Sequence, residues 1–363
     1  MATELRVPLY ETERLSAPTS VCVTGVTGYM AGPIVQRLLA MGHTVHGTCR
    51  APENTDTTKH LTALPGALER LKLFKADLLA PGSFDEAMAG CTLAIHTASP
   101  YIINVKQRDV RSRLIDPALR GTENVLAAVE KSESITRVVI TSSVAAVYPT
   151  PEFPQPAGKK YTEDHWNTVA TEKVLPYFCS KTLAERRAWE LAGAQTRWKL
   201  VVINPPAIYG PPLSSRADGE SVEFVKKMAA GEMKAACPKI GMGYTDVRDI
   251  AAAHTMAAFH PNAQGRYVAV AGSAYLSELN NALADAFPGV VPRAGGPVPK
   301  WLLMLLGPFL GLPRDLVKYN VNECPHFDHS KTVNDFGLTF IPMHEMMVDQ
   351  ATAMSALGII KKL

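Results

Sequence analysis

Tyr177 and Lys181 stand four residues apart in a segment whose pattern predicts a helix over residues 177–192. At this spacing both side chains project from one face of the helix, about one turn apart. A phenol with an ordinary pKa of about 10 gives up its proton reluctantly at neutral pH, and a nearby ammonium group lowers that pKa by favouring the phenolate. The pair could therefore transfer a proton to or from a substrate, although such pairs also arise by chance in a chain with 11 tyrosines.

Ser143 is a second candidate, because it ends the run Thr141-Ser142-Ser143 directly after a strand predicted over residues 137–141. Its hydroxyl could bind a substrate carbonyl. A serine in such a position is more often an ordinary loop residue, so the argument depends on what accompanies it. Together with the Tyr177 pair and a glycine-rich turn, Ser143 indicates a catalytic site.

That glycine-rich turn is the element that would bring a cofactor to these residues. Residues 21–32 read Val-Cys-Val-Thr-Gly-Val-Thr-Gly-Tyr-Met-Ala-Gly, which is an apolar strand, a turn and the start of a helix predicted over residues 29–41. Gly25 lets the chain leave the strand tightly, and Gly28 lets the backbone approach a pyrophosphate at the N-terminus of the helix. Ala31 is the third small position. The turn predicts dinucleotide binding, and a plain loop is the alternative.

Strands and helices alternate along most of the chain. Further strands are predicted over residues 44–49, 71–75, 93–97, 137–141, 199–204 and 266–270. Further helices are predicted over residues 116–131 and 222–230, from a capping box at Ser83 to residue 89, after an N-cap at Asp249, and from about residue 277. This order implies right-handed crossovers, a parallel sheet, and ligands at the carboxyl ends of its strands. We therefore expect a Rossmann-type doubly wound α/β fold.

The domain organisation follows from where this alternation weakens. We expect a polar, loosely held arm over residues 1–18 and an NADP-binding Rossmann domain over residues 19–210, with returns near residues 244–272. A smaller mixed substrate-binding lobe would be formed by residues 211–243 and 273–363.

The end of the second strand bears on cofactor choice. Chains that bind NAD usually place Asp or Glu near this point to hold the ribose hydroxyls, but here Cys49 and Arg50 stand. Arg50 can offer a fork of donors to the additional phosphate of NADP. The alternative is an ordinary solvated arginine.

Composition excludes several classes of function. The net charge is +3, and the 37 basic residues are scattered among 34 acidic ones, so no nucleic-acid partner is expected. Six cysteines without paired spacing favour a reducing, cytoplasmic environment and argue against disulfides and zinc. His96 and His254 have no second ligand at metal spacing, so no metal site is expected.

The longest apolar run, residues 301–312, contains Gly307 and Pro308 and is too short to span a bilayer. It could touch a membrane, form an oligomer contact, or act as a helical flap over an apolar substrate pocket, and we favour the flap. Met1 to Ser20 lack the apolar core of a secretory signal.

Seven short stretches resemble the extended short-chain dehydrogenase/reductases of the NAD-dependent epimerase/dehydratase superfamily. The resemblance is nearest to the dihydroflavonol reductase and cinnamoyl-CoA reductase branch, with its microbial aldehyde and ketone reductases, and covers nearly the whole chain from Val21. The matching stretches lie at residues 24–29, 76–78, 96–100, 141–143, 177–185, 204–211 and 246–249.

The resemblance implies a role for each matching position. Ser143, Tyr177 and Lys181 would be the catalytic trio. Asp77 and Leu78 would border the adenine, and Pro205 and Ile208 would line the nicotinamide. Further contacts with NADP(H) are implied for Thr24, Gly25, Thr27, Gly28, Tyr29, Met30, Thr97, Ala98, Ser99, Thr141, Tyr177 and Lys181.

Two departures from the family pattern concern the substrate. Dihydroflavonol reductases have an asparagine five places after the catalytic serine, where this chain has Tyr148. Cinnamoyl-CoA reductases carry Asn-Trp-Tyr-Cys-Tyr around the catalytic tyrosine, where residues 175–179 read Leu-Pro-Tyr-Phe-Cys. We expect Ser143, Tyr148 and Tyr177 to contact the substrate, and Tyr148 to crowd a polyhydroxylated ring.

These observations lead us to expect an NADPH-dependent carbonyl reductase that acts reversibly on apolar or aromatic aldehydes and ketones, as a monomer or homodimer. A dihydroflavonol or cinnamoyl-CoA type reductase is one alternative. A nucleotide-sugar epimerase or dehydratase, which retains its cofactor, is another, and Arg50 and the apolar run argue against it. A protein that senses NADP without turnover is the third, and the intact trio opposes it.

Overall fold

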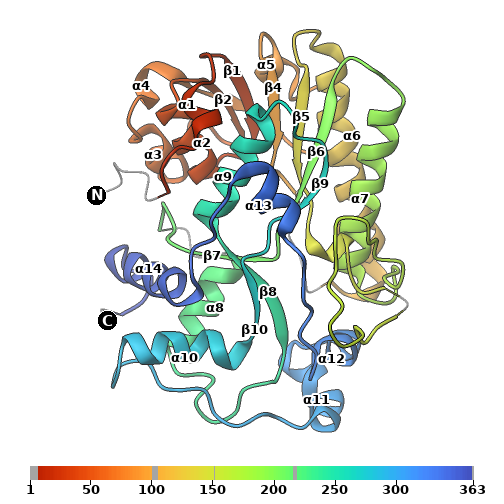
Figure 1. The fold of residues 1–363 in the computed structure, drawn as a ribbon, viewed down its shortest axis with the longest axis vertical. Helices are drawn as coiled ribbons and strands as arrows, with labels where there is room; N and C mark the ends of the chain where they lie inside the picture. Colours follow the sequence, from red (N-terminus) through yellow and green to blue (C-terminus); the bar gives the residue numbers. More distant parts are fainter. Residues whose placement is uncertain (1–6, 100–104, 151, 216–218, 362–363) are drawn as a thin grey trace.

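The computed structural model describes residues 7–99, 105–150, 152–215 and 219–361. Figure 1 shows a larger lobe built around a parallel sheet, with a smaller lobe below it. The larger sheet has seven strands and the smaller one has three.

The larger sheet has the strand order β3-β2-β1-β4-β5-β6-β9, and all of its pairings are parallel. Its strands are β1 (Ser20–Thr24), β2 (Thr44–Cys49), β3 (Leu71–Lys75), β4 (Leu93–His96), β5 (Arg137–Thr141), β6 (Lys199–Asn204) and β9 (Gly265–Val268). The direction in which the chain adds strands reverses between β1 and β4, which is where doubly wound sheets bind ligands. The expected doubly wound α/β fold is confirmed.

Helices cover both faces of this sheet, so its central strands are buried and apolar. One face carries α1 (Glu11–Arg14), α2 (Ala31–Ala40), α9 (Val247–Phe259) and α13 (Ser330–Phe336). The other face carries α5 (Asp85–Met88), α6 (Asp116–Lys131) and α7 (Pro176–Gly193). Between β2 and β3 lie α3 (Thr55–Thr62) and α4 (Ala67–Arg70). The helix α2 illustrates why these segments are helical: Ile34, Val35, Leu38 and Leu39 recur at helical spacing and are all buried.

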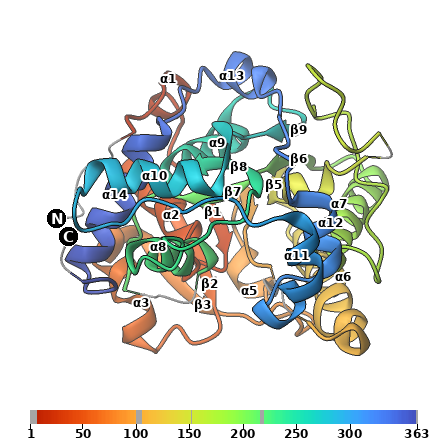
Figure 2. The ribbon, with the colours of Figure 1, turned by 90° about the horizontal axis from the view of Figure 1, so that it is seen from below.

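The smaller lobe has its own sheet and core. Its strands, in the order β10-β8-β7, are β7 (Ala207–Tyr209), β8 (Gly241–Asp246) and β10 (Gly272–Tyr275). Its helices are α8 (Glu220–Ala229), α10 (Leu276–Ala286), α11 (Lys300–Leu306), α12 (Arg314–Asn320) and α14 (Met343–Ala356). Figure 2 shows α8, α10 and α14 together on one side of the lobe, where Val225, Leu283 and Met347 form a shared core.

Four short helical segments complete the described chain. They are η1 (Gln107–Asp109), the π-helical turn η2 (Arg111–Ile115), η3 (Val144–Ala146) and η4 (Gly307–Leu310). The chain moves between the lobes more than once, because α9 and β9 return to the larger lobe after β8. The lobe boundaries expected from the sequence stay a prediction.

Two of the expected helix caps are wrong. The Ser83 hydroxyl donates to the Asp77 carbonyl at 2.7 Å instead of capping a helix, and α5 begins two residues later. The cap of α9 is Asp246, whose carboxylate accepts from the backbone N–H of Arg248 at 2.8 Å. Asp249 therefore lies inside the first turn of α9, where burial raises its pKa to about 7.

The described part of the N-terminal arm is firmly held. Glu13 is fully buried, and its carboxylate accepts from Arg37 Nε and from Thr255 Oγ1, both at 2.5 Å. These contacts join the arm to α2 and α9, so the expectation of a loosely held arm is wrong for residues 7–18. Residues 1–6 of the expected arm lie outside the described residues.

Candidate active site

The glycine-rich turn lies at the carboxyl end of β1 and has little room for side chains. Gly25 adopts a φ of 71°, and a Cβ added there would approach Ala98 Cβ to 3.0 Å. The turn is closed by a hydrogen bond from Gly28 N to Gly25 O at 2.9 Å, and α2 begins at Ala31. A tight glycine turn directly before the N-terminus of a helix is the local structure that a dinucleotide pyrophosphate requires.

Buried polar groups tie the ends of β1 and β4 together behind this turn. Thr24 Oγ1 accepts from the backbone N–H groups of Thr97 and Ala98, both at 3.2 Å. Its own proton is therefore donated to Nδ1 of His96, 2.8 Å away. Burial, with a smaller effect from the charge of Lys181, lowers the pKa of His96 to about 4, so this imidazole stays neutral and serves the fold.

Two other expected cofactor residues are occupied by contacts within the protein. The Tyr29 hydroxyl donates to the Gly210 carbonyl at 2.5 Å. Thr141 Oγ1 lies 2.7 Å from Nε2 of His254, whose Nδ1 donates to the Ile250 carbonyl at 2.7 Å. Because burial lowers the pKa of His254 to about 4, its Nε2 is the acceptor and the Thr141 hydroxyl points towards α9.

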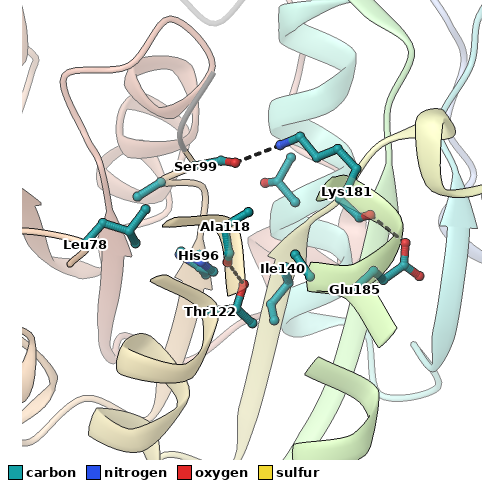
Figure 3. A pocket seen from close by; sticks show the side chains of 12 residues that line it. Leu78, His96, Ser99, Ala118, Thr122, Ile140, Lys181 and Glu185 are labelled. Carbon is teal, nitrogen blue, oxygen red and sulfur yellow. Dashed lines mark hydrogen bonds between the residues drawn. The ribbon is translucent and has the colours of Figure 1, made fainter. Parts of the chain in front are cut away.

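The helix α7 brings Tyr177 and Lys181 to the carboxyl end of the large sheet. Lys181 is 9% exposed, and its Nζ donates to Ser99 Oγ at 2.8 Å (Figure 3). The same Nζ lies 5.6 Å from the centre of the Tyr177 ring. Burial lowers the pKa of Lys181 to about 8, so the amine is charged at neutral pH and acts on its surroundings through a desolvated positive charge.

Ser143 lies where β5 ends and η3 begins. Its Oγ accepts from the backbone N–H of Ala145 at 3.1 Å, as the cap of η3. The hydroxyl donates to the Pro205 carbonyl over a long distance of 3.5 Å. Such a weak contact can be exchanged for a carbonyl oxygen of a substrate. Ser143 caps η3, which packs against α7, the helix that carries Tyr177 and Lys181. The catalytic role of these three residues stays a prediction.

Glu185 is a functional candidate that sequence reasoning missed. It is 2% exposed and lies one turn beyond Lys181 on α7. Its carboxylate accepts from Arg266 Nε at 2.6 Å, from Ser142 Oγ at 2.5 Å and from Asn204 Nδ2 at 2.8 Å. The spacing of four residues after Lys181 was the available signal, but its partners come from β5, β6 and β9, far away in the sequence.

A small cavity lies beside the face of α7 that carries Lys181 and Glu185 (Figure 3). Its volume is about 30 Å³, and Ser99, Thr122, Lys181 and Glu185 are among its polar lining residues. This volume is enough for about one water molecule, and the lining offers it hydrogen-bond partners. The cavity therefore joins the amine of Lys181 to the polar groups around Glu185.

Tyr148, expected to contact the substrate, belongs to an aromatic cluster. Its ring centre lies 5.5 Å from that of Tyr161, 5.6 Å from that of Phe178 and 5.3 Å from that of Phe327. The residue is 7% exposed, and burial raises its pKa. The ring thus backs the helix that carries Tyr177, and its contact with a substrate stays a prediction.

The remaining expected contacts are at the carboxyl edge of the sheet. Arg50 is exposed at the end of β2, and Asp77 is exposed after β3, where its carboxylate accepts from the Leu79 N–H at 2.8 Å. Pro205 is buried, and Leu78, Ile208, Met30 and Thr27 are partly buried. None of these cofactor contacts is tested by the geometry of the protein alone, and they stay predictions.

In the parts of the chain that the structure describes, no group of three or more His, Cys, Asp or Glu side chains is arranged to hold a metal ion. None of the described helices combines the length and apolar character needed to cross a bilayer. The six cysteines are free thiols, and five of them are buried.

The sequence pattern of the NAD dependent epimerase/dehydratase family matches residues 21–271. The chain belongs to this family. A cinnamoyl-CoA reductase of Medicago truncatula is 39% identical over 278 residues, which are 74% of this chain and 81% of that protein. A bifunctional dihydroflavonol 4-reductase/flavanone 4-reductase of Pyrus communis is 32% identical and covers 95% of this chain and 93% of its own length.

Solved structures of family members agree with this assignment. The Gre2 protein of Candida albicans in complex with NADPH is 26% identical, covers 94% of this chain and 99% of its own, and superposes with a TM-score of 0.77. Vestitone reductase from alfalfa is 26% identical with a TM-score of 0.72, covering 94% of this chain and 100% of its own. The branch of the family expected from the sequence is confirmed.

Proposed function

We propose that this chain is an NADP(H)-dependent carbonyl reductase that acts on apolar or aromatic aldehydes and ketones. The observation that carries the proposal is the buried, charged Lys181, with its Nζ 5.6 Å from the Tyr177 ring and bonded to Ser99 at 2.8 Å. An amine held in this way beside a phenol is the arrangement that general acid–base catalysis by tyrosine needs. The family members named above are reductases, and the Gre2 structure holds NADPH.

The turn at Gly25 fits a dinucleotide cofactor. Gly25 has a φ of 71°, which disfavours any other residue, and a Cβ there would press on Ala98 at 3.0 Å. The turn leads directly into the N-terminus of α2, where a pyrophosphate can be bound. NADPH, when bound, supplies the hydride. Arg50 would hold the ribose phosphate by a charge-assisted fork. The class expected from the sequence, an NADP-dependent oxidoreductase, is confirmed by the reductases to which the chain is similar.

Each member of the trio has one task in the reduction. Ser143 gives up its long contact to Pro205 and donates its hydroxyl proton in a hydrogen bond to the carbonyl oxygen of the substrate. Tyr177 donates a proton to that oxygen, which becomes the hydroxyl of the alcohol. Lys181 stabilises the resulting phenolate by its charge. The reverse alcohol oxidation uses the same groups.

The substrate class follows from what surrounds Tyr177. Phe178 packs edge-on against Tyr177, with ring centres 6.1 Å apart, and Tyr148 stands where flavonoid reducers carry an asparagine. Phe178 offers an apolar surface beside Tyr177, and the side chain at position 148 offers no amide group to a hydroxylated ring. The free, mostly buried thiols support a reducing compartment such as the cytoplasm.

A substrate panel tests the proposal. NADPH consumption is followed with apolar aldehydes, activated ketones, dihydroflavonols and acyl-CoA thioesters. We expect the first two groups to have the highest kcat/KM. A dihydroflavonol or cinnamoyl-CoA in first place would assign the alternative substrate. Absence of turnover with every carbonyl would favour a sensor, and NAD retained through purification would favour an epimerase.

A further inference from the structure

The outer side of α11 and η4 exposes large apolar side chains. Trp301 is 68% exposed, Leu305 57%, Leu306 43% and Phe309 87%. We call these four residues the α11 apolar face. Most surface apolar residues of a folded protein occur singly, so four together on one short segment mark a contact surface.

The segment that carries this face is anchored on its inner side. Leu303 is 3% exposed and belongs to the same core as Val317 of α12. Lys300 Nζ also donates to the carbonyls of Lys318 and Val321, at 2.8 Å and 3.0 Å. The α11 apolar face is therefore held outward by packing on its other side, which does not fit the flap favoured from the sequence.

The α11 apolar face lies at an end of the molecule. Figure 1 shows α11 at the lower end of the smaller lobe, below α12, and Figure 2, seen from below, shows it at the front. A projecting position suits contact with an extended surface better than the capture of a small molecule.

The sequence around the α11 apolar face contains basic residues but few acidic ones. No Asp or Glu occurs between Asp285 and Asp315, whereas this stretch contains Lys300 and Arg314. Asp285 is paired with Arg293, and the carboxylate of Asp315 accepts from the Leu175 N–H at 2.5 Å.

Two exposed cations lie on α12, which packs against α11. Arg314 and Lys318 are exposed, and Arg314 Nε also donates to the Met304 carbonyl at 3.3 Å. Apolar side chains bordered by cations are complementary to a surface with anionic headgroups over an apolar interior.

The composition of the face favours one of two possible occupants. A stable contact with a second copy of a chain needs about 20 to 30 residues on each side, of which these four would be a small part. A membrane interface is engaged by a few aromatic and aliphatic side chains together with basic residues, which is the set found here.

We propose that the α11 apolar face docks the protein onto a lipid surface with anionic headgroups. Trp301, Leu305, Leu306 and Phe309 enter the headgroup region, and Arg314 and Lys318 contact the headgroups. This inference goes beyond the carbonyl reductase activity and does not depend on it.

The test is flotation of the full chain with vesicles of phosphatidylcholine, with and without phosphatidylserine. The double variant Leu305→Ser/Phe309→Ser is compared with Leu68→Ser, which changes a leucine that is 98% exposed on α4. We expect the unchanged chain and Leu68→Ser to float with the phosphatidylserine vesicles, and the double variant to bind at least about tenfold more weakly. Arg314→Glu should weaken binding to the same vesicles.

A second measurement needs no variant. Brominated acyl chains should quench tryptophan fluorescence of the unchanged chain, because Trp301 would lie in the lipid. Failure to float, equal binding by the double variant, equal binding to neutral vesicles, or no quenching would each overturn the proposal. So would a dimer, measured by light scattering, that the double variant abolishes, because a second copy would then cover the face.

Discussion

Single residues carry the proposed chemistry, and Tyr177 has the most direct role. The variant Tyr177→Phe removes only the hydroxyl, so the aromatic contact with Phe178 and the fold should be retained. Loss of the general acid should reduce kcat by about a hundredfold or more while the Kd for NADPH changes little. Steady-state kinetics and fluorescence titration measure the two quantities. Near-normal turnover would show that another group supplies the proton.

The lowered pKa of Lys181 predicts that the rate of reduction depends on pH. Burial lowers its pKa from the ordinary 10.5 to about 8, so the amine is charged below that pH and neutral above it. The phenolate left when Tyr177 donates its proton loses its neighbouring positive charge as pH rises through this value. We therefore expect kcat/KM for reduction to fall above a pH of about 8, measured with a substrate that does not titrate. Activity that stays constant up to the ordinary lysine pKa would contradict this role.

Helices and strands position these residues, and Glu185 connects α7 to the larger sheet by hydrogen bonds and an ion pair. Its carboxylate binds Arg266, Ser142 and Asn204, and Asn204 Nδ2 also donates to the Ser143 carbonyl at 3.2 Å. The variant Glu185→Ala should lower the free energy of unfolding by about 3 to 5 kcal/mol, because it leaves a buried arginine unpaired. We therefore expect Glu185 to influence the proposed reaction by positioning Ser143.

The matched control for that variant is Glu190→Ala on the same helix. Glu190 pairs with Arg187 at 3.1 Å, but its side chain is 65% exposed. A surface pair of this kind contributes about 1 kcal/mol at most. Urea unfolding of both variants measures the difference, and kcat should fall only for Glu185→Ala. Similar small effects from both would remove the proposed link between α7 and the sheet.

Four strands of the larger sheet are the elements that the sequence predicts best. The bounds of β2, β3, β5 and β6 agree with those expected, because each is an apolar or β-branched run that ends at a turn. The strands β7, β8 and β10 were missed. Residues 241–246 of β8 read Gly-Met-Gly-Tyr-Thr-Asp, and glycine and aspartate disfavour a strand until neighbouring strands supply the pairing.

Prediction of the site has a similar limit. Tyr177 and Lys181 could be paired from the sequence because four residues on one helix define a distance. The network of Glu185 could not, because Ser142, Asn204 and Arg266 reach it only after three strands have paired. The cap predictions at Ser83 and Asp249 fail because a local pattern suggests a bond that other contacts replace. Ser83 bonds to Asp77 in the preceding loop, and Asp249 accepts from the distant Ile341 N–H.

For the whole molecule, the two lobes meet at the carboxyl end of the large sheet, and the cofactor should stabilise both. A ligand that binds only the folded state adds about 2.7 kcal/mol of stability at one hundred times its Kd. We expect NADPH to raise the melting temperature by several degrees and NADH to raise it less, because Arg50 stands where an acidic residue would select NAD.

In Arg50→Ala the affinity for NADPH should fall by roughly tenfold to a hundredfold, with little change for NADH. Lys59→Ala, which removes an exposed cation on the nearby α3, is the control for a general loss of positive charge. Equal losses of affinity for both cofactors in Arg50→Ala, or an equal loss of NADPH affinity in Lys59→Ala, would mean that Arg50 does not bind the ribose phosphate.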